Sequence, residues 1–505
     1  MPIPFLHGTA FITGLVILML EVLGSRVMAP FFGVSLYIWA SLISVTLIAL
    51  SLGYWLGGTI ADRKNKPDFL YSIILFSAIA IISIPFFAPP IMDWSYNLLG
   101  IKGGVLLSAL LIFSVPLILL GMASPYLIRL LVTGPEGVGG VAGGGFAIST
   151  LGSVIGALLT AFVLIPNIGV NKSFTLGALL LIFVSGAYSI AWKKYYQVLI
   201  AVLILLISLY LLLFYQKTLA KDDLRKVVFQ TDTLYGQLKV VDILGSDYRA
   251  ALIDGGVQNI LNQSVYKIEP SSYVSQLAQL LPAFGIRSGD VLVIGLGAGE
   301  VPRVLSKLGY QIDIVEIDPK VETMAKNYFN FSSKFGRVII DDGRRYIRNS
   351  KKKYDLIFID VASGGTQPWY FFTNEAFQEM AKILRPGGII GINLIGYYQG
   401  EKSKSAHSIY RTLMTAYKYS EIYIPTNPDP SFLTNIIFFA SDKPFSDNSE
   451  KEKILKNLYG IRVNFNPQDG IILTDNYNPL DLWSIEVSEA FRKAMFGWLG
   501  EKILR

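Results

Sequence analysis

From its first residue to about residue 216, the chain consists of long apolar runs separated by short polar loops. A helix needs roughly 20 apolar residues to cross the hydrocarbon core of a bilayer. The pattern therefore predicts seven membrane spans, near residues 8–29, 37–60, 69–89, 104–124, 142–165, 174–191 and 197–215. Because the first run lacks a basic start and further spans follow it, we expect a span there and not a cleaved signal peptide.

Beyond this region the apolar runs become short and alternate with polar positions. The stretches "GQLKVVDI", "YRAALIDG" and "VQNILN" are typical of β-hairpins, because they alternate and are separated by turn-forming residues. From about residue 288 strands alternate with amphipathic helices, which is the signature of a parallel α/β sheet. The expected strands are 290–296, 311–318, 337–342, 354–360, 388–394, 420–425 and 435–441.

These patterns predict a multi-span α-helical membrane domain, then a small β-hairpin domain and an α/β Rossmann-like domain. The expected boundaries are 1–216 for the transmembrane domain, 227–280 for the β-hairpin domain, 281–445 for the Rossmann-like domain and 446–505 for a C-terminal extension. The composition agrees, because the 505 residues are 52% hydrophobic and only 16% charged. Soluble domains are nearer a quarter charged.

Composition also excludes several kinds of site. The chain contains no cysteine, which rules out disulfides, thiolate zinc sites, iron–sulfur clusters and cysteine nucleophiles. His7 and His407 are its two histidines, so we expect no metal site. The net charge of +7 fits basic loops beside membrane spans. No Lys/Arg-rich stretch interleaved with aromatic residues indicates nucleic acid, and none is expected as a partner.

The expected protein is a multi-pass protein of the cell membrane, in contact with membrane lipids. Short basic loops predict which side of the membrane each end of a span faces, because they are enriched on the cytoplasmic side. Such loops contain Arg63, Lys64, Lys66, Arg129, Lys193 and Lys194. If they are cytoplasmic, the N-terminus is inside and seven spans place the second half outside. The co-substrate inferred below is made in the cytosol, so we expect that a span or re-entrant segment is miscounted.

Two features lie inside the expected spans. Glu21 and Arg26 are within or at the end of the first span, where ionisable residues are costly and usually face the bundle interior. They form either a site for a cationic or polar group or a structural pair with each other or with a neighbouring helix. The glycine-rich stretch 137–159 predicts close helix packing, because small residues let backbones approach.

The stretch "VLVIGLGAGE" (291–300) joins a strand to a helix through Gly295, Gly297 and Gly299. A dinucleotide-binding turn would place its third glycine at position 300. Glu300 is there instead, and its charge would repel a phosphate at a helix N-terminus. The loop therefore favours a cofactor without phosphates and with a cationic centre. S-adenosylmethionine and its decarboxylated form both fit.

Acidic residues end the next strands. Glu316 is placed to accept hydrogen bonds from both ribose hydroxyls, as the acidic residue of dinucleotide folds does. Asp342, which precedes Gly343 in "DDG", is placed to accept from the adenine amino group, and Asp360 ends the following strand. This ordered set is much more specific than the glycine loop alone. A Rossmann-like domain with an empty pocket, and a helix-capping role for Asp360, stay open.

From about residue 228 to 441 the sequence resembles the spermidine synthases, which are polyamine aminopropyltransferases. The matching stretches are "TLYGQLKVVD", "LIDGGVQ", "SSYVSQLAQLLP", "VLVIGLGAGEVPRVL", "VEIDP", "DDGRRYI", "YDLIFID" and "NEAFQEMAKILRPGG". The whole chain resembles the membrane-fused branch of this family, through Glu21 to Arg26, "LGYWLGGTIADR", "LIPNIG" and "ILTDNYNPLD". The resemblance implies a Rossmann-like domain of the class I methyltransferase type, decarboxylated S-adenosylmethionine as co-substrate and 5′-methylthioadenosine as product.

The resemblance also implies roles for individual residues. Asp360 would occupy the catalytic aspartate position, and Tyr273 matches a tyrosine that lines the amine site. The cofactor-binding residues would be Gln237, Gln258, Gly295, Gly297, Gly299, Glu316, Asp342 and Gly343.

The chain departs from the family pattern at the acceptor end. Ala298 replaces an aspartate that helps to bind the aminopropyl group, and Ser363 replaces a second aspartate that grips the diamine. Asn427 lies where the family has a substrate tyrosine, and Val274 where it has Gln or His. Because a dication needs fixed carboxylates to offset its desolvation, putrescine is not the expected acceptor.

We therefore predict a membrane-bound aminopropyltransferase of polyamine biosynthesis that acts on a small-molecule amine, with a homodimer as a further expectation. Asp360 would orient the neutral amine and take its proton. Asp475 is a candidate for the missing acceptor carboxylate. Four aromatic residues either flank the acceptor or belong to the core: Trp369, Tyr370, Tyr397 and Tyr398.

Two rival hypotheses stay open. The first is a methyltransferase that uses S-adenosylmethionine on a lipid or another membrane-borne substrate, which Ala298 and Ser363 favour. The second is a transporter or sensor whose soluble domain binds a nucleoside or polyamine. The β-hairpin domain and "YDLIFID" favour aminopropyl transfer over the methyltransferase.

Overall fold

The computed structural model describes residues 1–32, 36–132, 134, 137–213, 221–263, 272–361, 368–425, 429–445, 451–453, 456, 460–500 and 503. The chain forms two compact units. One contains Met1–Thr218 with Thr231–Gly236, and the other contains Leu219–Gln230 with Gln237–Leu504.

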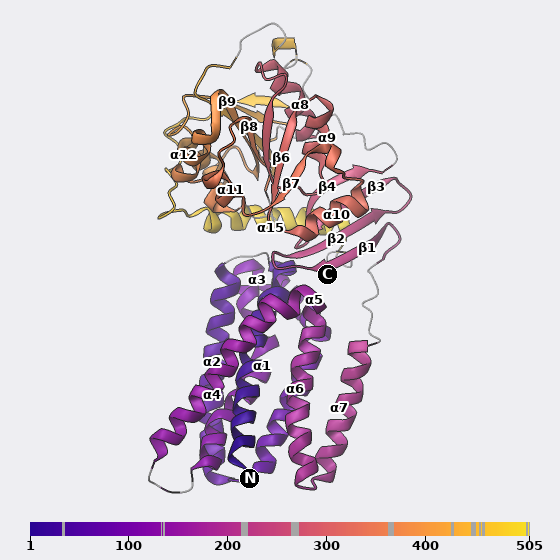
Figure 1. Ribbon diagram of the computed structural model, residues 1–505, viewed down its shortest axis with the longest axis vertical. Coiled ribbons are helices and arrows are strands. Elements are labelled where there is room, and N and C mark those ends of the chain that lie inside the picture. The colour runs from indigo at the N-terminus through magenta and orange to yellow at the C-terminus, as the bar shows by residue number, and fades with distance from the viewer. Residues whose placement is uncertain are drawn as a thin grey trace. The chain divides into compact units, whose positions relative to one another are not determined.

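The first unit is helical (Figure 1). Its helices are α1 (Ile3–Phe32), α2 (Leu36–Arg63), α3 (Pro67–Leu131), α4 (Val138–Leu159), α5 (Ile165–Ile168), α6 (Val170–Ala191) and α7 (Tyr195–Leu213), with a π-helical turn, η1 (Thr160–Leu164), between α4 and α5. Among the described residues, five stretches are long and apolar enough to cross a membrane: Ile3–Phe32, Leu36–Arg63, Pro67–Leu131, Val138–Ile168 and Val170–Ala191. A shorter apolar helix covers Tyr195–Tyr210.

Helix α3 is a hairpin of two arms. Gly100 interrupts it with non-helical dihedral angles, φ 66° and ψ −163°. The arms lie side by side, because the Tyr126 hydroxyl near the end of α3 donates to the Lys66 carbonyl at 3.1 Å and the Tyr126 ring lies 6.0 Å from that of Phe69. The spans predicted at 69–89 and 104–124 are these arms. A helix or helical arm therefore lies at each of the seven predicted positions, and membrane crossing stays a prediction.

The predicted basic loops gather at one pole of the helical unit. Arg129 pairs with Asp62 at 3.3 Å, and Lys194 pairs with Asp68 at 2.6 Å. Figure 1 shows the N-terminus at this pole and α7 running away from it. Of the seven predicted spans, the one at 197–215 corresponds to the shorter apolar helix Tyr195–Tyr210. If this helix does not cross, six spans remain and the basic-loop rule places both the N-terminus and the second half on the cytoplasmic side.

The glycine-rich stretch divides into a packed face and an open face. A Cβ atom at Gly152 would lie 2.1 Å from the Phe11 carbonyl oxygen, and one at Gly156 would lie 2.2 Å from that of Leu15. These two glycines thus let α4 and α1 touch through their backbones, as expected. The glycines on the open face, where a Cβ atom would meet no other atom within 4 Å, are Gly139, Gly140, Gly143 and Gly144.

The second unit contains two sheets. The small one has the order β1-β2-β3-β4 and the strands β1 (Arg225–Asp232), β2 (Gln237–Ile243), β3 (Tyr248–Ile253) and β4 (Gly256–Asn262). The pairs β2–β3 and β3–β4 are antiparallel. The predicted β-hairpins are confirmed, and β1 adds a strand that the motif stretches did not include.

The large sheet has the order β12-β10-β11-β9-β8-β5-β6-β7. Its strands are β5 (Asp290–Ile294), β6 (Gln311–Glu316), β7 (Arg337–Ile340), β8 (Tyr354–Ile359), β9 (Leu384–Gly396), β10 (Tyr419–Ile424), β11 (Thr434–Ser441) and β12 (Ile461–Val463). Strands β5 to β9 pair in parallel, whereas β10, β11 and β12 are antiparallel to their neighbours. The predicted Rossmann-like fold is confirmed.

Helices follow the strands of the large sheet, as the alternating pattern predicts. They are α8 (Tyr273–Ala283), α9 (Glu300–Lys307), α10 (Pro319–Phe329), α11 (Gly343–Asn349), α12 (Asn374–Ile383), α13 (Lys404–Leu413) and α15 (Leu480–Leu499). Separate apolar clusters cover the sheet, one around Val291 and Val293 and one around Leu292 and Ile294. Strand β5 therefore buries both of its faces, which explains its continuous apolar run.

The C-terminal extension joins both sheets. Strand β12 pairs with β10 at the edge of the large sheet. Leu499, the last residue of α15, and Ile503 join an apolar cluster on the small sheet with Val227, Val241, Ala250 and Leu252. The buried Lys239 ammonium also donates to the Ile503 carbonyl oxygen at 3.2 Å.

Candidate active site

The glycine loop brings the ends of β5 and β8 together. Gly295 has φ 97°, in the left-handed region, and a Cβ atom there would lie 2.2 Å from the Asp360 carbonyl oxygen. The Asp360 amide donates to the Ile294 carbonyl oxygen at 2.9 Å. Only glycine fits this close approach. The loop and Asp360, both predicted site elements, are therefore neighbours.

The small sheet also touches the glycine loop. A Cβ atom at Gly297 would lie 2.5 Å from Asn259 Oδ1 and 4.0 Å from the Cβ of Gln258, both on β4. Asn259 Oδ1 accepts a hydrogen bond from the Ala298 amide at 2.8 Å. Gln258 thus lies beside the loop, as predicted. Asn259 was missed, and its signal was a second polar residue in the apolar strand "VQNILN".

Glu316 at the end of β6 faces the same loop. Its Oε2 accepts from the Leu296 amide at 3.0 Å, and its Oε1 accepts from the Asp318 amide at 2.9 Å. Burial raises the pKa of this carboxyl group to about 7. A carboxylate has about four lone-pair sites. A backbone hydrogen bond from Ile317 also lowers the pKa of Glu316, so three sites are used by the backbone and one remains for a ribose hydroxyl.

Asp342 and Gly343 begin α11. Asp342 Oδ1 caps the helix by accepting from the Arg345 amide at 2.8 Å. A Cβ atom at Gly343 would lie 2.7 Å from a methyl group of Ile294, so this position packs directly on β5. Asp342 also lines a cavity of about 530 Å³ together with Arg344, Arg345, Arg348, Asn349 and Tyr370. Its predicted adenine contact stays a prediction.

Asp360 is held by two side chains. The Tyr273 hydroxyl donates to its Oδ2 at 2.7 Å, and Asn393 Nδ2 donates to its Oδ1 at 2.9 Å. Asn435 Nδ2 in turn donates to Asn393 Oδ1 at 2.8 Å. Burial raises the pKa of Asp360, and the hydrogen bonds from Asn393 and Tyr273 oppose that rise. Tyr273 thus lies beside Asp360 as predicted, whereas Asn393 and Asn435 were missed.

Glu300, the first residue of α9, completes the acidic set. It is only 7% exposed, and its Oε2 accepts from Asn259 Nδ2 at 3.1 Å. Burial raises the pKa of Glu300 to about 7, and the charge of Asp360 raises it further. Burial and then the charges of Asp360 and Glu300 hold the pKa of Tyr273 well above its usual range. The charges of Glu300 and Asp360 therefore affect the pKa of Tyr273, and the charge of Asp360 affects that of Glu300.

Comparison with known proteins assigns this half of the chain. Residues 272–452 match the model of the spermine/spermidine synthase domain. The second half carries a spermine/spermidine synthase domain. Glu300, Glu316 and Asp360 all lie within the matched residues.

The curated relatives include both kinds of transferase. The polyamine aminopropyltransferase of Thermoplasma volcanium is 36% identical over 147 residues, which are 28% of this chain and 54% of that protein. The polyamine aminopropyltransferase of Vibrio vulnificus is 37% identical over 123 residues, 23% of this chain and 40% of that protein. The N-terminal histidine N-methyltransferase of Emericella nidulans is 28% identical over 266 residues, 48% of this chain and 46% of that protein.

This chain spans about half the length of the curated relatives that it matches. Among solved structures, the spermidine synthase of Thermotoga maritima has a TM-score of 0.38 at 16% identity, covering 54% of this chain and 94% of that one. Human methyltransferase-like protein 13, in complex with SAH, has a TM-score of 0.31 at 26% identity, covering 36% of this chain and 86% of that one.

The structure also places other predicted site residues. Gln237 begins β2, and its amide donates to Asp254 Oδ1 at 2.8 Å. Gly299 has φ 78° and precedes α9. Trp369 lies in a short 3₁₀ turn, η3 (Trp369–Phe371), and its carbonyl accepts from Asn478 Nδ2 at 3.1 Å. Ser363 and Asn427 lie outside the described residues.

Asp475 belongs to the C-terminal extension and forms an ion pair with the synthase domain. Arg344 donates to its Oδ1 at 2.6 Å and to its Oδ2 at 2.7 Å, and the Thr373 hydroxyl donates to Oδ1 at 2.7 Å. The hydrogen bond from Arg344 is the largest cause of the lowered pKa of Asp475. These contacts give the carboxylate a structural role, and they do not favour the predicted role of acceptor ligand.

Arg344 anchors the C-terminal extension, and its loss is expected to be costly. Its side chain is 9% exposed and also bonds Glu379 at 2.9 Å. Replacing Arg344 by Met leaves two carboxylates without this partner and should lower the free energy of unfolding by about 3–5 kcal/mol. Urea denaturation in detergent, followed by circular dichroism, measures the change.

The matched control is Arg345→Met on the same helix. Arg345 is 67% exposed and pairs with Asp341. Its loss should change the free energy of unfolding by less than about 1 kcal/mol. Equal losses from both substitutions would contradict the anchoring role of Arg344.

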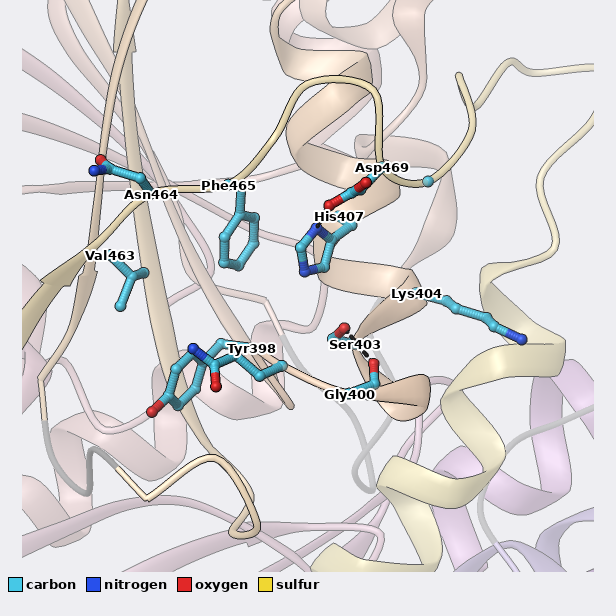
Figure 2. A pocket seen from close by; sticks show the side chains of 11 residues that line it. Tyr398, Gly400, Ser403, Lys404, His407, Val463, Asn464, Phe465 and Asp469 are labelled. Carbon is cyan, nitrogen blue, oxygen red and sulfur yellow. Dashed lines mark hydrogen bonds and ion pairs between the residues drawn. The ribbon is translucent and has the colours of Figure 1, made fainter.

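A separate cavity of about 390 Å³ lies between the segments 398–407 and 463–470 (Figure 2). The His407 ring stacks on Phe465 at 4.2 Å, and His407 Nδ1 lies 3.6 Å from Asp469. Tyr398, one of the predicted flanking aromatics, lines it. The predicted catalytic and cofactor-binding residues do not line this cavity. In the part of the chain that the structure describes, no cluster of three His, Asp or Glu residues is placed to hold a metal ion.

Proposed function

We propose that the protein is a membrane-bound aminopropyltransferase. It would transfer the aminopropyl group of decarboxylated S-adenosylmethionine to an amine acceptor and release 5′-methylthioadenosine. The observation that carries this proposal is the Asp360 carboxylate, held by Tyr273 and Asn393 directly beside the glycine loop. The match of residues 272–452 to the synthase domain supports it.

In this proposal, different residues of the site bind the nucleoside and accept the proton. Glu316 and the loop around Gly295 would hold the nucleoside. The co-substrate supplies an electrophilic methylene group next to a sulfonium leaving group. A primary amine is mostly protonated at pH 7 and must be neutral to attack. Asp360 would therefore orient the amine and take its proton as the new C–N bond forms and the C–S bond breaks, with the C–S electron pair passing to sulfur.

The hydrogen bonds of Asp360 suit this task. Tyr273 and Asn393 fix one conformation of the carboxylate, which keeps it aligned with an incoming amine. Burial raises the pKa of Asp360 and thereby makes it a better proton acceptor than an exposed aspartate. The apolar helices would anchor the enzyme among membrane lipids.

The test is a product assay with purified protein in detergent. The protein is incubated with either decarboxylated or intact S-adenosylmethionine and a panel of amines, and the products are weighed by mass spectrometry. Formation of methylthioadenosine with an aminopropylated amine supports the proposal. Methylthioadenosine bound without any turnover would support a binding protein, such as the transporter or sensor considered above, and would overturn the enzyme assignment.

One observation favours a second candidate, an S-adenosylmethionine-dependent methyltransferase acting on a membrane-borne substrate. The relative matched over 266 residues, the longest of the three alignments given above, is an N-methyltransferase. Ala298 also lacks the carboxylate expected for an aminopropyl donor. In the assay this candidate predicts S-adenosylhomocysteine as product and methylated lipid or protein.

A further inference from the structure

Glu300 is a buried carboxylate in an unusual place for its residue type. A glutamate in the first turn of a helix usually faces water, where it complements the helix dipole. Here Glu300 directly follows the loop glycine Gly299 and is 7% exposed. Burial of a charge is costly unless a partner offsets it. The position therefore calls for a partner of opposite charge.

The protein itself supplies little compensation. The one hydrogen bond of Glu300 within the described residues comes from the neutral Asn259 side chain, at 3.1 Å. The charge of Arg303 on the same helix lowers the pKa of Glu300, but this is the smallest of the effects that shift it. The Arg303 guanidinium donates to the Phe329 carbonyl oxygen at 2.5 Å and lies 4.6 Å from the Phe335 ring centre.

The charged group that acts on Glu300 from another element is acidic. Asp360, at the end of β8, raises the pKa of Glu300, and both carboxylates raise that of Tyr273 on α8. The pKa of Asp360 is raised by burial and lowered by hydrogen bonds from Asn393 and Tyr273. Neither of these two residues carries a positive charge. A cation bound at Glu300 and Asp360 would therefore offset the charge of both carboxylates.

Four amides of the glycine loop are not available to an anion, because they already have acceptors in the protein. The amides of Gly295 and Gly299 donate to the Val315 and Leu296 carbonyl oxygens at 2.9 and 2.8 Å. Those of Leu296 and Ala298 donate to Glu316 and Asn259.

We propose that Glu300 binds the terminal ammonium of a decarboxylated sulfonium nucleoside and, with Asp360, excludes a nucleoside that carries an α-carboxylate. Glu300 thereby takes over the role of a carboxylate that Ala298 cannot provide. This inference rests on the proposed function and narrows it, because it selects the aminopropyl donor over the methyl donor.

Binding to the full-length protein in detergent tests the proposal by calorimetry. The probes are methylthioadenosine, which has no ammonium, and decarboxylated and intact S-adenosylmethionine. A charged hydrogen bond is worth about 1.5–3 kcal/mol, or roughly 10- to 100-fold in affinity. We expect wild-type protein to prefer the decarboxylated over the intact compound by about that factor.

The informative variant is Glu300→Gln, which keeps the shape and still accepts from Asn259. It should weaken binding of the decarboxylated compound by about 10- to 100-fold and leave methylthioadenosine within about twofold. Glu322→Gln on α10 removes a carboxylate that pairs with Lys326 and is the matched control, with no expected change. Equal losses for both ligands in Glu300→Gln would mean a structural role and would overturn the proposal.

The pH dependence of ligand binding provides a second test, because a purely structural role of Glu300 would not alter it. Glu316 and Glu300 both have a pKa raised to about 7 by burial. Glu316 contributes equally to ribose binding in decarboxylated S-adenosylmethionine and in methylthioadenosine. Its contribution therefore cancels in the ratio of the affinities of the decarboxylated compound and methylthioadenosine. The ratio should therefore rise with pH through about 7 more steeply in wild-type protein than in Glu300→Gln, where Asp360 is the remaining carboxylate that can face the ammonium.

The failures of the two proposals can be told apart. If wild-type protein does not bind methylthioadenosine, the proposed function fails and the role of Glu300 fails with it. If methylthioadenosine binds but wild-type protein accepts the intact compound as tightly as the decarboxylated one, only the role of Glu300 fails. This comparison needs no variant and stands even if Glu300→Gln does not fold.

Discussion

Replacing Asp360 by Asn is expected to lower kcat by about 10²- to 10⁴-fold, the usual contribution of a positioned acid–base group. Asn has nearly the same shape and can still meet Tyr273 and Asn393, but it cannot accept a proton. Binding of methylthioadenosine should therefore persist. Steady-state assays with the best amine from the panel, together with calorimetry, measure the two effects separately.

Asp442→Asn is the control for this prediction. Asp442 is exposed, directly follows β11 and accepts from the amide of Gly387, near the start of β9. Its substitution should leave kcat unchanged. An Asp360→Asn protein with wild-type kcat would refute the proton-accepting role, and one that no longer binds methylthioadenosine would assign Asp360 to nucleoside binding instead.

Replacing Glu316 by Gln should weaken methylthioadenosine binding by about 10²-fold or more, because each hydrogen bond to a charged acceptor contributes about 1.5–3 kcal/mol. The present carboxylate accepts from the backbone amides of Leu296 and Asp318. A Gln side chain has one oxygen, so its NH₂ group must face one of these amides. The substitution therefore disturbs the glycine loop as well as removing the charge.

Calorimetry with methylthioadenosine checks this prediction against Glu322→Gln, which removes a charge from the next helix. The wild-type affinity should also rise with pH through about 7, because burial raises the pKa of Glu316 to about 7 and the ionised form is the better hydrogen-bond acceptor. Unchanged binding in Glu316→Gln would show that the ribose does not reach this residue.

Much of this architecture could be predicted from periodicity. The strands from β5 to β11 lie within a few residues of the apolar runs that predicted them, because each is short, buried and bounded by turn residues. Helix α3 could not be predicted as one hairpin. A window of apolar residues does not reveal that Gly100 breaks a helix whose arms then pack on each other.

The candidate site was predicted in part. Residues that end strands, such as Glu316 and Asp360, could be placed because parallel strands end at one edge of the sheet. Asn259, Asn393 and Asn435 could not be assigned partners, because their hydrogen bonds join segments far apart in sequence. The burial of Glu300 depends on how β4 packs on α9, which no local pattern encodes.

The path of the C-terminal extension limits how this protein can be shortened. The recognised domain stops at residue 452, ahead of β12 and of the residues that cover the small sheet. A protein cut there would present the β10 backbone as an open edge, ready to pair with another chain. It would also uncover the apolar patch around Val227 and Val241. Such a fragment should precipitate on expression, whereas a soluble fragment for crystallisation must keep its last fifty residues or so.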